Sequence, residues 1–171
     1  MRHTLEAAGL PDIPVVGALV TVPAGFERLD WYGRGPHENY QDRKSAAFVG
    51  RHRSTVDAQV APYVRPQQTG NMTDVRRIAL TDRTGDGLAV LADPADGEPF
   101  LEVSALHHTP FDLDGPRHPH EVKRRAETVL GVDHRQMGVS GNDSWGAPPK
   151  EPYLLRAGRT HTYGYRLRAA G

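Results

Sequence analysis

Short runs of apolar residues, several of them alternating with polar residues, recur along the whole chain. Residues 15–22 are almost continuously apolar and predict a buried strand. Residues 160–168 alternate with a period of two, which predicts a half-buried antiparallel strand. One face of that strand holds His161, Tyr163, Tyr165 and Leu167. Further strands are predicted at residues 26–32, 74–80, 88–91, 100–106 and 128–132.

Few segments have the periodicity of a helix. The pattern predicts a short helix at residues 43–49, with Asp42 as its N-cap, and a single turn at residues 109–113. Residues 81–87 have the composition of a hairpin loop. With 18 Gly and 14 Pro spread over 171 residues, the chain is interrupted too often for long helices. The predicted fold class is therefore mostly β, a single-domain sandwich of antiparallel sheets.

Composition limits the classes of partner. The chain has 21 Lys and Arg against 21 Asp and Glu, so its formal net charge is zero with His neutral. Nucleic acids and anionic membranes attract concentrated positive charge, and we expect neither as a partner. The longest apolar run, residues 15–20, is too short to span a membrane. The N-terminus lacks the apolar core of a signal peptide, so the expected compartment is the cytoplasm.

The nine histidines are candidate metal ligands, whereas the absence of Cys excludes thiolate sites and disulfides. His107 and His108 are adjacent and would point to opposite faces of a strand. His118 and His120 would share a face with Glu121 beside them, and two His with a carboxylate can ligate zinc or iron. The neighbouring Arg and Lys residues oppose cation binding, so a surface or sheet-edge strand is the preferred interpretation.

Two carboxylates, Glu38 and Asp42, form a nominal pair of the kind that glycoside hydrolysis requires. The structural alternative makes Asp42 a cap and pairs Glu38 with Arg34, Arg43 or Arg51. We prefer this alternative, because a carboxylate held by Arg keeps a low pKa and is unsuited to general acid catalysis. No Gly-x-Ser-x-Gly nucleophile turn or phosphate-binding loop is found, and no catalytic residue is predicted in the chain.

One of the two tryptophans, Trp145, lies in a glycine-rich polar loop at residues 136–146. Two interpretations are open. The indole could fold back onto the core as a loop anchor, which residue chemistry alone favours because Trp is highly buried on average. Alternatively, it could stand free as a flat platform on which a sugar or base stacks.

Three loops taken together resemble a known family. They are residues 31–43 (WYGRGPHENYQDR), residues 62–71 (PYVRPQQTGN) and residues 136–146 (QMGVSGNDSWG). In this order and spacing they closely resemble the C-terminal domain of the large bacterial β-galactosidases of glycoside hydrolase family 2. In some bacteria that domain is a separate small chain. The resemblance runs from about Leu10 to Leu167 and so covers nearly the whole chain.

The resemblance implies a fold and a set of partners. The fold is an antiparallel supersandwich like that of galactose mutarotases, lacking its first strands here. It occupies residues 10–168, between a flexible segment at 1–9 and a tail at 169–171. The catalytic glutamates and the magnesium and sodium ligands are expected on a catalytic barrel elsewhere, so no cofactor is expected in this chain. The barrel-bearing chain or domain and a galactoside are the expected partners, in an enzyme expected to be oligomeric.

The same resemblance implies the site residues. Trp145 corresponds to a Trp that lines the substrate pocket, and Asn142, Asp143 and Ser144 are expected to fix the turn beneath it. The loops that carry Glu38 and Arg65 are expected to be internal supports.

The sequence departs from the family pattern at three places. Gln41 stands where the family commonly has Pro, Gln68 where it has Glu, and Asn142 where it has Asp. Two acids of the pattern are therefore missing, so the supporting contacts need not be those of the family.

Three hypotheses follow. The preferred one is a non-catalytic portion of a β-galactosidase, inactive alone, which works with a barrel-bearing part. The second is a stand-alone carbohydrate-binding or sugar-epimerising module, which would need a His and a Glu to converge, with His37–Glu38 or His118–Glu121 as candidates. The third is a structural or degenerate fragment.

Overall fold

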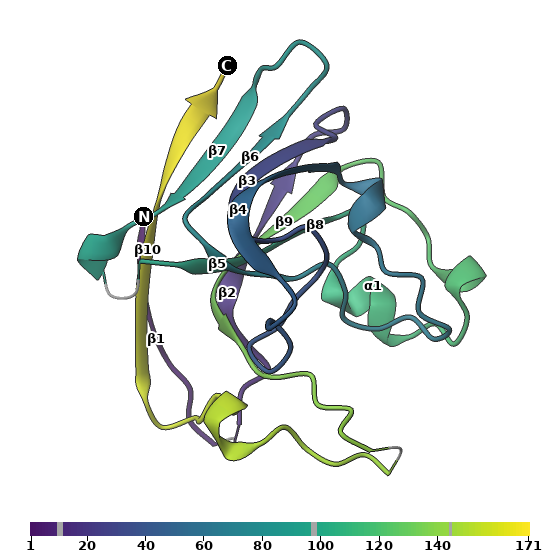
Figure 1. Ribbon diagram of the computed structural model, residues 1–171, viewed down its shortest axis with the longest axis vertical. Coiled ribbons are helices and arrows are strands. Elements are labelled where there is room, and N and C mark those ends of the chain that lie inside the picture. The colour runs from purple at the N-terminus through teal and green to yellow at the C-terminus, as the bar shows by residue number, and fades with distance from the viewer. Residues whose placement is uncertain (10–11, 97–98, 144) are drawn as a thin grey trace.

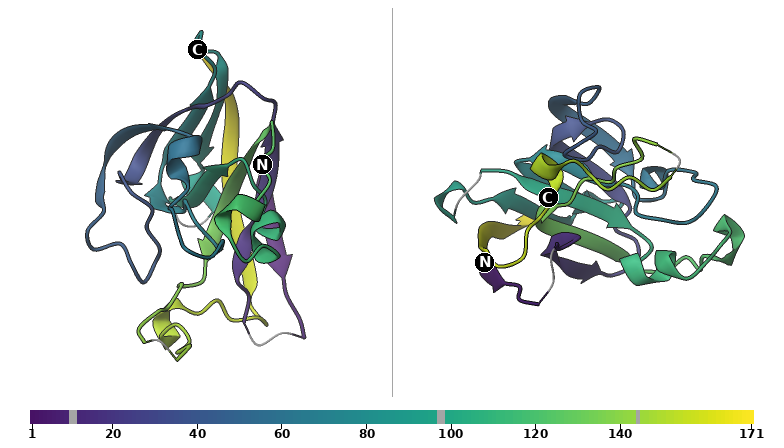
Figure 2. Two further views of the ribbon diagram at one scale, coloured as in Figure 1. Left: turned by 90° about the vertical axis from the view of Figure 1, so that its right-hand side faces the viewer. Right: turned by 90° about the horizontal axis from the view of Figure 1, so that it is seen from below.

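Two antiparallel β-sheets pack face to face in the computed structural model, which describes residues 1–9, 12–96, 99–143 and 145–171 (Figures 1 and 2). The core lies between the sheets, and the strands are joined by loops and short helical turns. The predicted fold class, a mostly β sandwich of antiparallel sheets, is confirmed.

The first sheet has six strands in the order β1-β10-β7-β6-β3-β4. Each pair of neighbouring strands in this sheet is antiparallel. Its strands are β1 (Arg2–Glu6), β10 (Thr160–Ala170), β7 (Gly87–Ala92), β6 (Arg77–Thr81), β3 (Arg28–Gly35) and β4 (Phe48–Thr55).

The second sheet has four strands in the order β2-β9-β8-β5. They are β2 (Val15–Val22), β9 (Thr128–Gln136), β8 (Leu101–Leu106) and β5 (Met72–Val75). The one α-helix among the described residues, α1 (Pro110–Asp114), follows β8, and Thr109 caps it as the predicted single turn requires. Single 3-10 turns occur at Asp57–Gln59, Pro94–Asp96, Pro119–Glu121 and Glu151–Tyr153.

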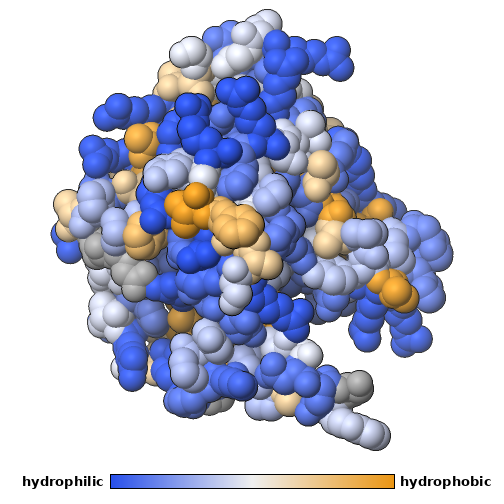
Figure 3. Space-filling view, viewed as in Figure 1, coloured by the Kyte–Doolittle hydropathy of each residue, from blue (hydrophilic) through white to orange (hydrophobic). Residues whose placement is uncertain are grey.

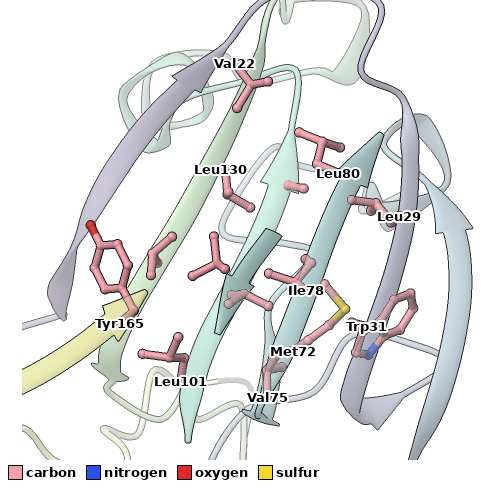
Figure 4. Packing of buried hydrophobic residues seen from close by; sticks show 14 of the residues in the cluster. Val22, Leu29, Trp31, Met72, Val75, Ile78, Leu80, Leu101, Leu130 and Tyr165 are labelled. Atoms are coloured by element: carbon pink, nitrogen blue, oxygen red, sulfur yellow. The ribbon is translucent and has the colours of Figure 1, made fainter. Parts of the chain in front are cut away.

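Side chains from the inner faces of both sheets form one core (Figure 4). Trp31 and Ile78 come from the first sheet, and Met72 and Leu130 from the second; each is at most 1 % exposed. Tyr163 and Tyr165 of β10 are also buried, as the alternation of that strand predicts. The core follows the predicted period of two at Tyr163 and Tyr165, but Leu167, which was predicted on the same face, is 40 % exposed.

The predicted single strand at residues 74–80 is wrong. The chain forms β5 in the second sheet, turns at Arg76 and continues as β6 in the first sheet. Asp74 has a positive φ of 54°, which a regular strand does not allow. The backbone N–H of Arg76 then donates to the carbonyl of Tyr32 in β3, at 2.8 Å. One apolar run therefore supplies both sheets.

The predicted helix at residues 43–49 is also wrong. Tyr40 and Arg43 exchange backbone hydrogen bonds across a tight turn, and β4 begins at Phe48. The Nη1 of Arg34 donates to the carbonyl of Lys44 at 3.3 Å and to that of Ala47 at 2.7 Å. The carbonyl of Lys44 also accepts the backbone N–H of Ala47 at 3.1 Å, which closes a single turn that does not continue as a helix.

The N-terminal residues differ from the predicted flexible segment at 1–9, because Arg2–Glu6 form the edge strand β1. The ring of His3 stacks on that of Tyr163, with 4.9 Å between the ring centroids. The mostly polar sequence of this strand lacks an apolar alternation that would have indicated it.

The face shown in Figure 3 is largely hydrophilic, with small, separate hydrophobic patches. Among the described residues, no helix has the length and apolar character needed to cross a membrane.

Candidate functional site

Trp145 stands free of the sandwich. Its side chain is 93 % exposed, on a loop that extends below both sheets in Figures 1 and 2. The interpretation of Trp145 as a loop anchor folded onto the core is therefore wrong. The other tryptophan, Trp31, is the buried one, and its Nε1 donates to the carbonyl of Arg34 at 2.9 Å.

The Trp145 loop, residues 137–149, is held in shape by its own short-range hydrogen bonds. The Oδ1 atom of Asp143 accepts the backbone N–H of Trp145 at 2.8 Å and that of Ala147 at 3.2 Å. The hydroxyl of Ser140 donates to the carbonyl of Ala147, which closes the base of the loop. The Asp143 contacts are those expected of an Asp that fixes a turn. The side chain of Asn142 is exposed, and Ser144 lies outside the described residues.

Asp42 supports this loop from a distant part of the chain. Its carboxylate accepts the backbone N–H of Val139 at 3.2 Å and that of Ser140 at 2.9 Å. The prediction of Asp42 as a helix N-cap is therefore wrong. Asp42 instead anchors the Trp145 loop. The approach is close: a Cβ on Gly138 would lie 2.7 Å from Oδ2 of Asp42, so this position requires Gly.

Arg43 adds a second long-range contact to the same loop. Its Nη2 donates to the carbonyl of Ser140, so both backbone polar groups of Ser140 are bound by the Asp42–Arg43 pair. Ser140 has a positive φ of 59°, an uncommon conformation for a residue other than Gly. The two charged side chains hold the backbone where the loop leaves the sandwich. Sequence reasoning missed this role, although both residues lie in a motif that it singled out.

Glu38 supports the loop at residues 62–71, the second of the three loops that resemble the family. Its carboxylate accepts the hydroxyls of Tyr63 and Thr69, the latter at 3.0 Å, and the backbone N–H of Gly70 at 2.7 Å. The predicted ion pair between Glu38 and an Arg is wrong, because these neutral donors occupy both oxygens. Burial and the hydrogen bond to Glu38 raise the pKa of Tyr63 to about 12. Arg65 is exposed and makes no hydrogen bond or ion pair with the described residues.

A buried polar network lies between these loops. Asn39 binds Thr73 through its Oδ1 atom, which accepts the backbone N–H at 2.9 Å and the hydroxyl at 2.6 Å. Glu102, only 2 % exposed, accepts the amides of Asn71 at 3.0 Å and Gln41 at 2.7 Å. Gln41 thus makes a hydrogen bond that a Pro at this position could not make. Oδ1 of Asn71 is the one buried side-chain atom of this network without a hydrogen-bond partner among the described residues. The other contacts fix the geometry of the loops that they join.

A pocket of about 480 Å³ opens between the second loop and the base of the Trp145 loop. Its lining includes Tyr40, Arg43, Tyr63, Gln68 and Gln136. These side chains offer hydroxyl, guanidinium and amide groups, so the pocket suits a polar occupant rich in hydrogen-bonding groups.

The predicted metal candidates have other partners. Glu121 accepts the backbone N–H of Arg117 at 2.7 Å and that of His118 at 3.2 Å, as a turn cap does. The rings of His118 and His120 stack with 5.5 Å between centroids. These contacts account for the Glu121 carboxylate without a metal ion.

A second group of potential ligands is formed by Glu27, Asp57 and His107, whose ligand atoms lie within 4.8 Å of one another. The guanidinium of Arg124 already lies among them. It is 2.8 Å from Nε2 of His107 and 3.0 Å from Oδ1 of Asp57. This group is therefore an ion-pair cluster centred on an Arg.

These features define a class: a two-sheet β sandwich that presents an exposed indole on a loop that Asp42 and Arg43 support from a distant part of the chain. A sequence model of the family described as "Beta galactosidase small chain" matches residues 1–167. The chain belongs to this family.

Relatives agree with this assignment. The chain is 42 % identical over 159 residues to the β-galactosidase of Priestia megaterium, covering 93 % of this chain and 15 % of that protein. It is 38 % identical over 161 residues to the β-galactosidase of Halalkalibacterium halodurans, and the match covers 92 % of this chain and 16 % of that protein. For the β-galactosidase of Streptococcus thermophilus the identity is 32 % over 160 residues, and the match covers 94 % of this chain and 15 % of that protein. The chain thus spans about 15 % of the length of these relatives.

Proposed function

We propose that this chain is a non-catalytic portion of a β-galactosidase that completes the active site of a separate catalytic barrel by stacking Trp145 on the galactoside. The observation that carries the proposal is the 93 % exposed indole on a loop that Asp42 and Arg43 hold in place. An exposed indole on a fixed backbone is available to a ligand or partner, and its burial there would remove apolar surface from water.

The chemistry of an indole suits this role. A galactoside has an apolar C–H face and a rim of hydroxyls. Trp145 can cover the apolar face with few rotatable bonds to immobilise, while the hydroxyls find donors and acceptors elsewhere. Asn142, Asp143 and Ser144 are proposed to set the angle of the indole through the turn.

The bond-breaking groups are proposed to lie in the catalytic part, together with its magnesium and sodium ions. The carboxylate of Glu38, the best candidate in this chain, is occupied by Tyr63, Thr69 and Gly70. We therefore expect the isolated chain to be inactive. The proposal also places the assembled enzyme in the cytoplasm, as an oligomer that acts on lactose or a related galactoside.

The test is complementation. This chain is mixed with the Priestia megaterium β-galactosidase from which the matched 159-residue region has been removed, and hydrolysis of a chromogenic galactoside is measured. Activity should require both parts. In parallel, acrylamide should quench Trp145 fluorescence in the isolated chain and quench it less in the assembled enzyme. No association and no activity with any truncated relative would contradict the proposal.

The stand-alone alternative is tested on the isolated chain. Titration with galactose and a mutarotation assay should both be negative. Galactose binding or mutarotation by the isolated chain would favour that alternative instead.

A further inference from the structure

The outer face of the four-stranded sheet carries a groove of about 240 Å³. Leu130 and Val132 of β9 point into the core, so the alternation of the strand places Asp133 on the opposite, outer face. Gly17, Ser104 and Asp133 line the groove, and apolar side chains from β2 and α1 line it as well. The groove is therefore largely apolar, with Gln68, Ser104 and His108 as its polar side chains and Asp133 as its one carboxyl group.

Asp133 is buried without a partner. It is only 7 % exposed, and its carboxyl lies over Gly17, where a Cβ would come within 2.5 Å of Cγ of Asp133. Within the part of the chain that the structure describes, its carboxyl makes no hydrogen bond or ion pair. Buried carboxyl groups are almost always paired, so this one requires an explanation.

A second carboxyl group, that of Glu102, lies close to Asp133. Glu102 lies opposite Asp133 in the register of β8 and β9. Glu102 already binds Gln41 and Asn71, and Arg135 lies 4.0 Å from it. Two carboxyl groups thus lie close together here, and a cation at Asp133 would be attracted.

The rim of the groove is apolar and exposed. Phe111 is 84 % exposed and Leu19 is 50 % exposed, and both line the groove. Gln68 lines both this groove and the pocket at the base of the Trp145 loop, so the two hollows are neighbours. Apolar side chains that surround a buried polar group, here the Asp133 carboxyl, are typical of an interface core.

We propose that this outer groove docks the catalytic remainder of the enzyme, and that a Lys or Arg of that partner places its apolar stem along Leu19 and Phe111 and its charged head on Asp133. The inference rests on the proposed function. The chain covers 15 % of the Priestia megaterium relative, so most of that protein is available as the docking partner. A long basic side chain matches the groove, because its methylenes bury against apolar surface while its head finds a carboxylate.

Substitutions test the surface in the complementation system, with dissociation constants measured between this chain and the truncated Priestia megaterium enzyme. Phe111→Asp should weaken association at least tenfold, and Asp133→Asn should weaken it several-fold. Phe48→Asp is the matched control, because Phe48 is an exposed Phe, at 73 %, on the other sheet. It should leave association unchanged. Thermal melts of each isolated variant show whether the fold is intact.

Cross-linking identifies the occupant without relying on a loss of binding. The chain has no Cys, so a photo-cross-linker can be attached at Leu19→Cys alone, with Val64→Cys as an exposed control. The Leu19→Cys adduct should capture a peptide of the catalytic part that contains Lys or Arg.

Failure of the wild-type chain to associate would overturn the proposed function. Normal association with equal effects of Phe111→Asp and Phe48→Asp would overturn only the docking inference. Capture of a second copy of this chain, or of a peptide without a basic residue, would also overturn it.

Discussion

The carboxylate of Asp42 accepts the backbone N–H of Ser140 at 2.9 Å, although the two residues lie 98 positions apart in the chain. Asp42 belongs to the turn that precedes β4 of the first sheet, and Ser140 follows β9 of the second. One side chain thus connects the two sheets at the point where the Trp145 loop leaves them. The position of the indole depends on this connection.

Removing the Asp42 carboxylate should release the Trp145 loop. Asp42→Ala is expected to lower the free energy of unfolding by about 1–3 kcal/mol, since two backbone donors lose a charged acceptor. In the assembled enzyme it should raise KM for the galactoside, because the indole is no longer held.

Asp82→Ala is the matched control for Asp42→Ala. Asp82 also accepts backbone N–H groups, those of Thr84, Gly85 and Asp86, but in the β6–β7 hairpin far along the chain from the Trp145 loop. It should leave KM unchanged. Equal KM values for wild type and Asp42→Ala would show that the Asp42 contact does not position the loop.

The hydrogen bond from Tyr63 to Glu38 should be visible as a shifted phenol pKa. Burial and the Glu38 carboxylate raise the pKa of Tyr63 from 10.0 to about 12. Glu38→Gln removes the negative charge, so the pKa of Tyr63 should fall toward its usual value while burial keeps it somewhat raised. Ultraviolet titration of tyrosinate measures this, with Tyr63→Phe to assign the signal. An unchanged titration in Glu38→Gln would contradict the contact.

Asp133 should make the isolated chain less stable as the pH rises. Burial and the Glu102 carboxylate raise the pKa of Asp133 from 3.8 to about 8 in the folded chain. Below about pH 4 the carboxyl is protonated in both the folded and the unfolded state, so its titration does not change the free energy of unfolding. Between about pH 4 and 8 the unfolded state loses its proton first, so the free energy of unfolding falls.

Asp133→Asn should remove that loss. The difference in unfolding free energy between the variant and the wild type is expected to grow by about 2–5 kcal/mol from pH 4 to pH 8. Denaturant unfolding at several pH values measures this difference, in which the titration of other groups cancels. A difference that is constant with pH would contradict the buried, unpaired state of Asp133.

Gly17 should be intolerant of a side chain for a local reason. A Cβ there would overlap the Asp133 carboxyl, so Gly17→Ala is expected to cost about 1–3 kcal/mol of stability. Gly50→Ala is the control, since its nearest heavy atom would be 3.5 Å away. Adding Asp133→Ala to Gly17→Ala should recover part of the loss, because the new Cβ would still lie 2.8 Å from Cα of Asp133. Fully additive destabilisation in the double variant would argue against the overlap with the carboxyl.

The strands were the part of the fold that sequence patterns could predict. The apolar run at residues 15–22 and the alternation at residues 160–168 became β2 and β10, because one buried face determines the period of a strand. The switch between sheets at Arg76 could not be predicted. It depends on a positive φ at Asp74 and on long-range backbone pairing, and neither leaves a local pattern.

The site shows the same division. The motifs around Glu38, Asp42 and Trp145 could be singled out, but their partners could not, because each contact joins distant segments. Asp42 looked like a helix cap, since a cap and a loop anchor use the same carboxylate chemistry. The exposure of Trp145 was also opposite to what residue chemistry favours, because the average burial of Trp does not determine the position of a single loop residue.

The most direct test of the proposed function is KM for a chromogenic galactoside in the complemented enzyme, compared between wild type, Trp145→Ala and Trp145→Phe. Trp145→Ala is expected to raise KM by about 10- to 100-fold, equivalent to about 1.4–2.8 kcal/mol, and Trp145→Phe is expected to raise KM less. Val64→Ala, at a side chain that is 88 % exposed, should have no effect. An unchanged KM for Trp145→Ala in a fully assembled enzyme would contradict a role for Trp145 at the substrate.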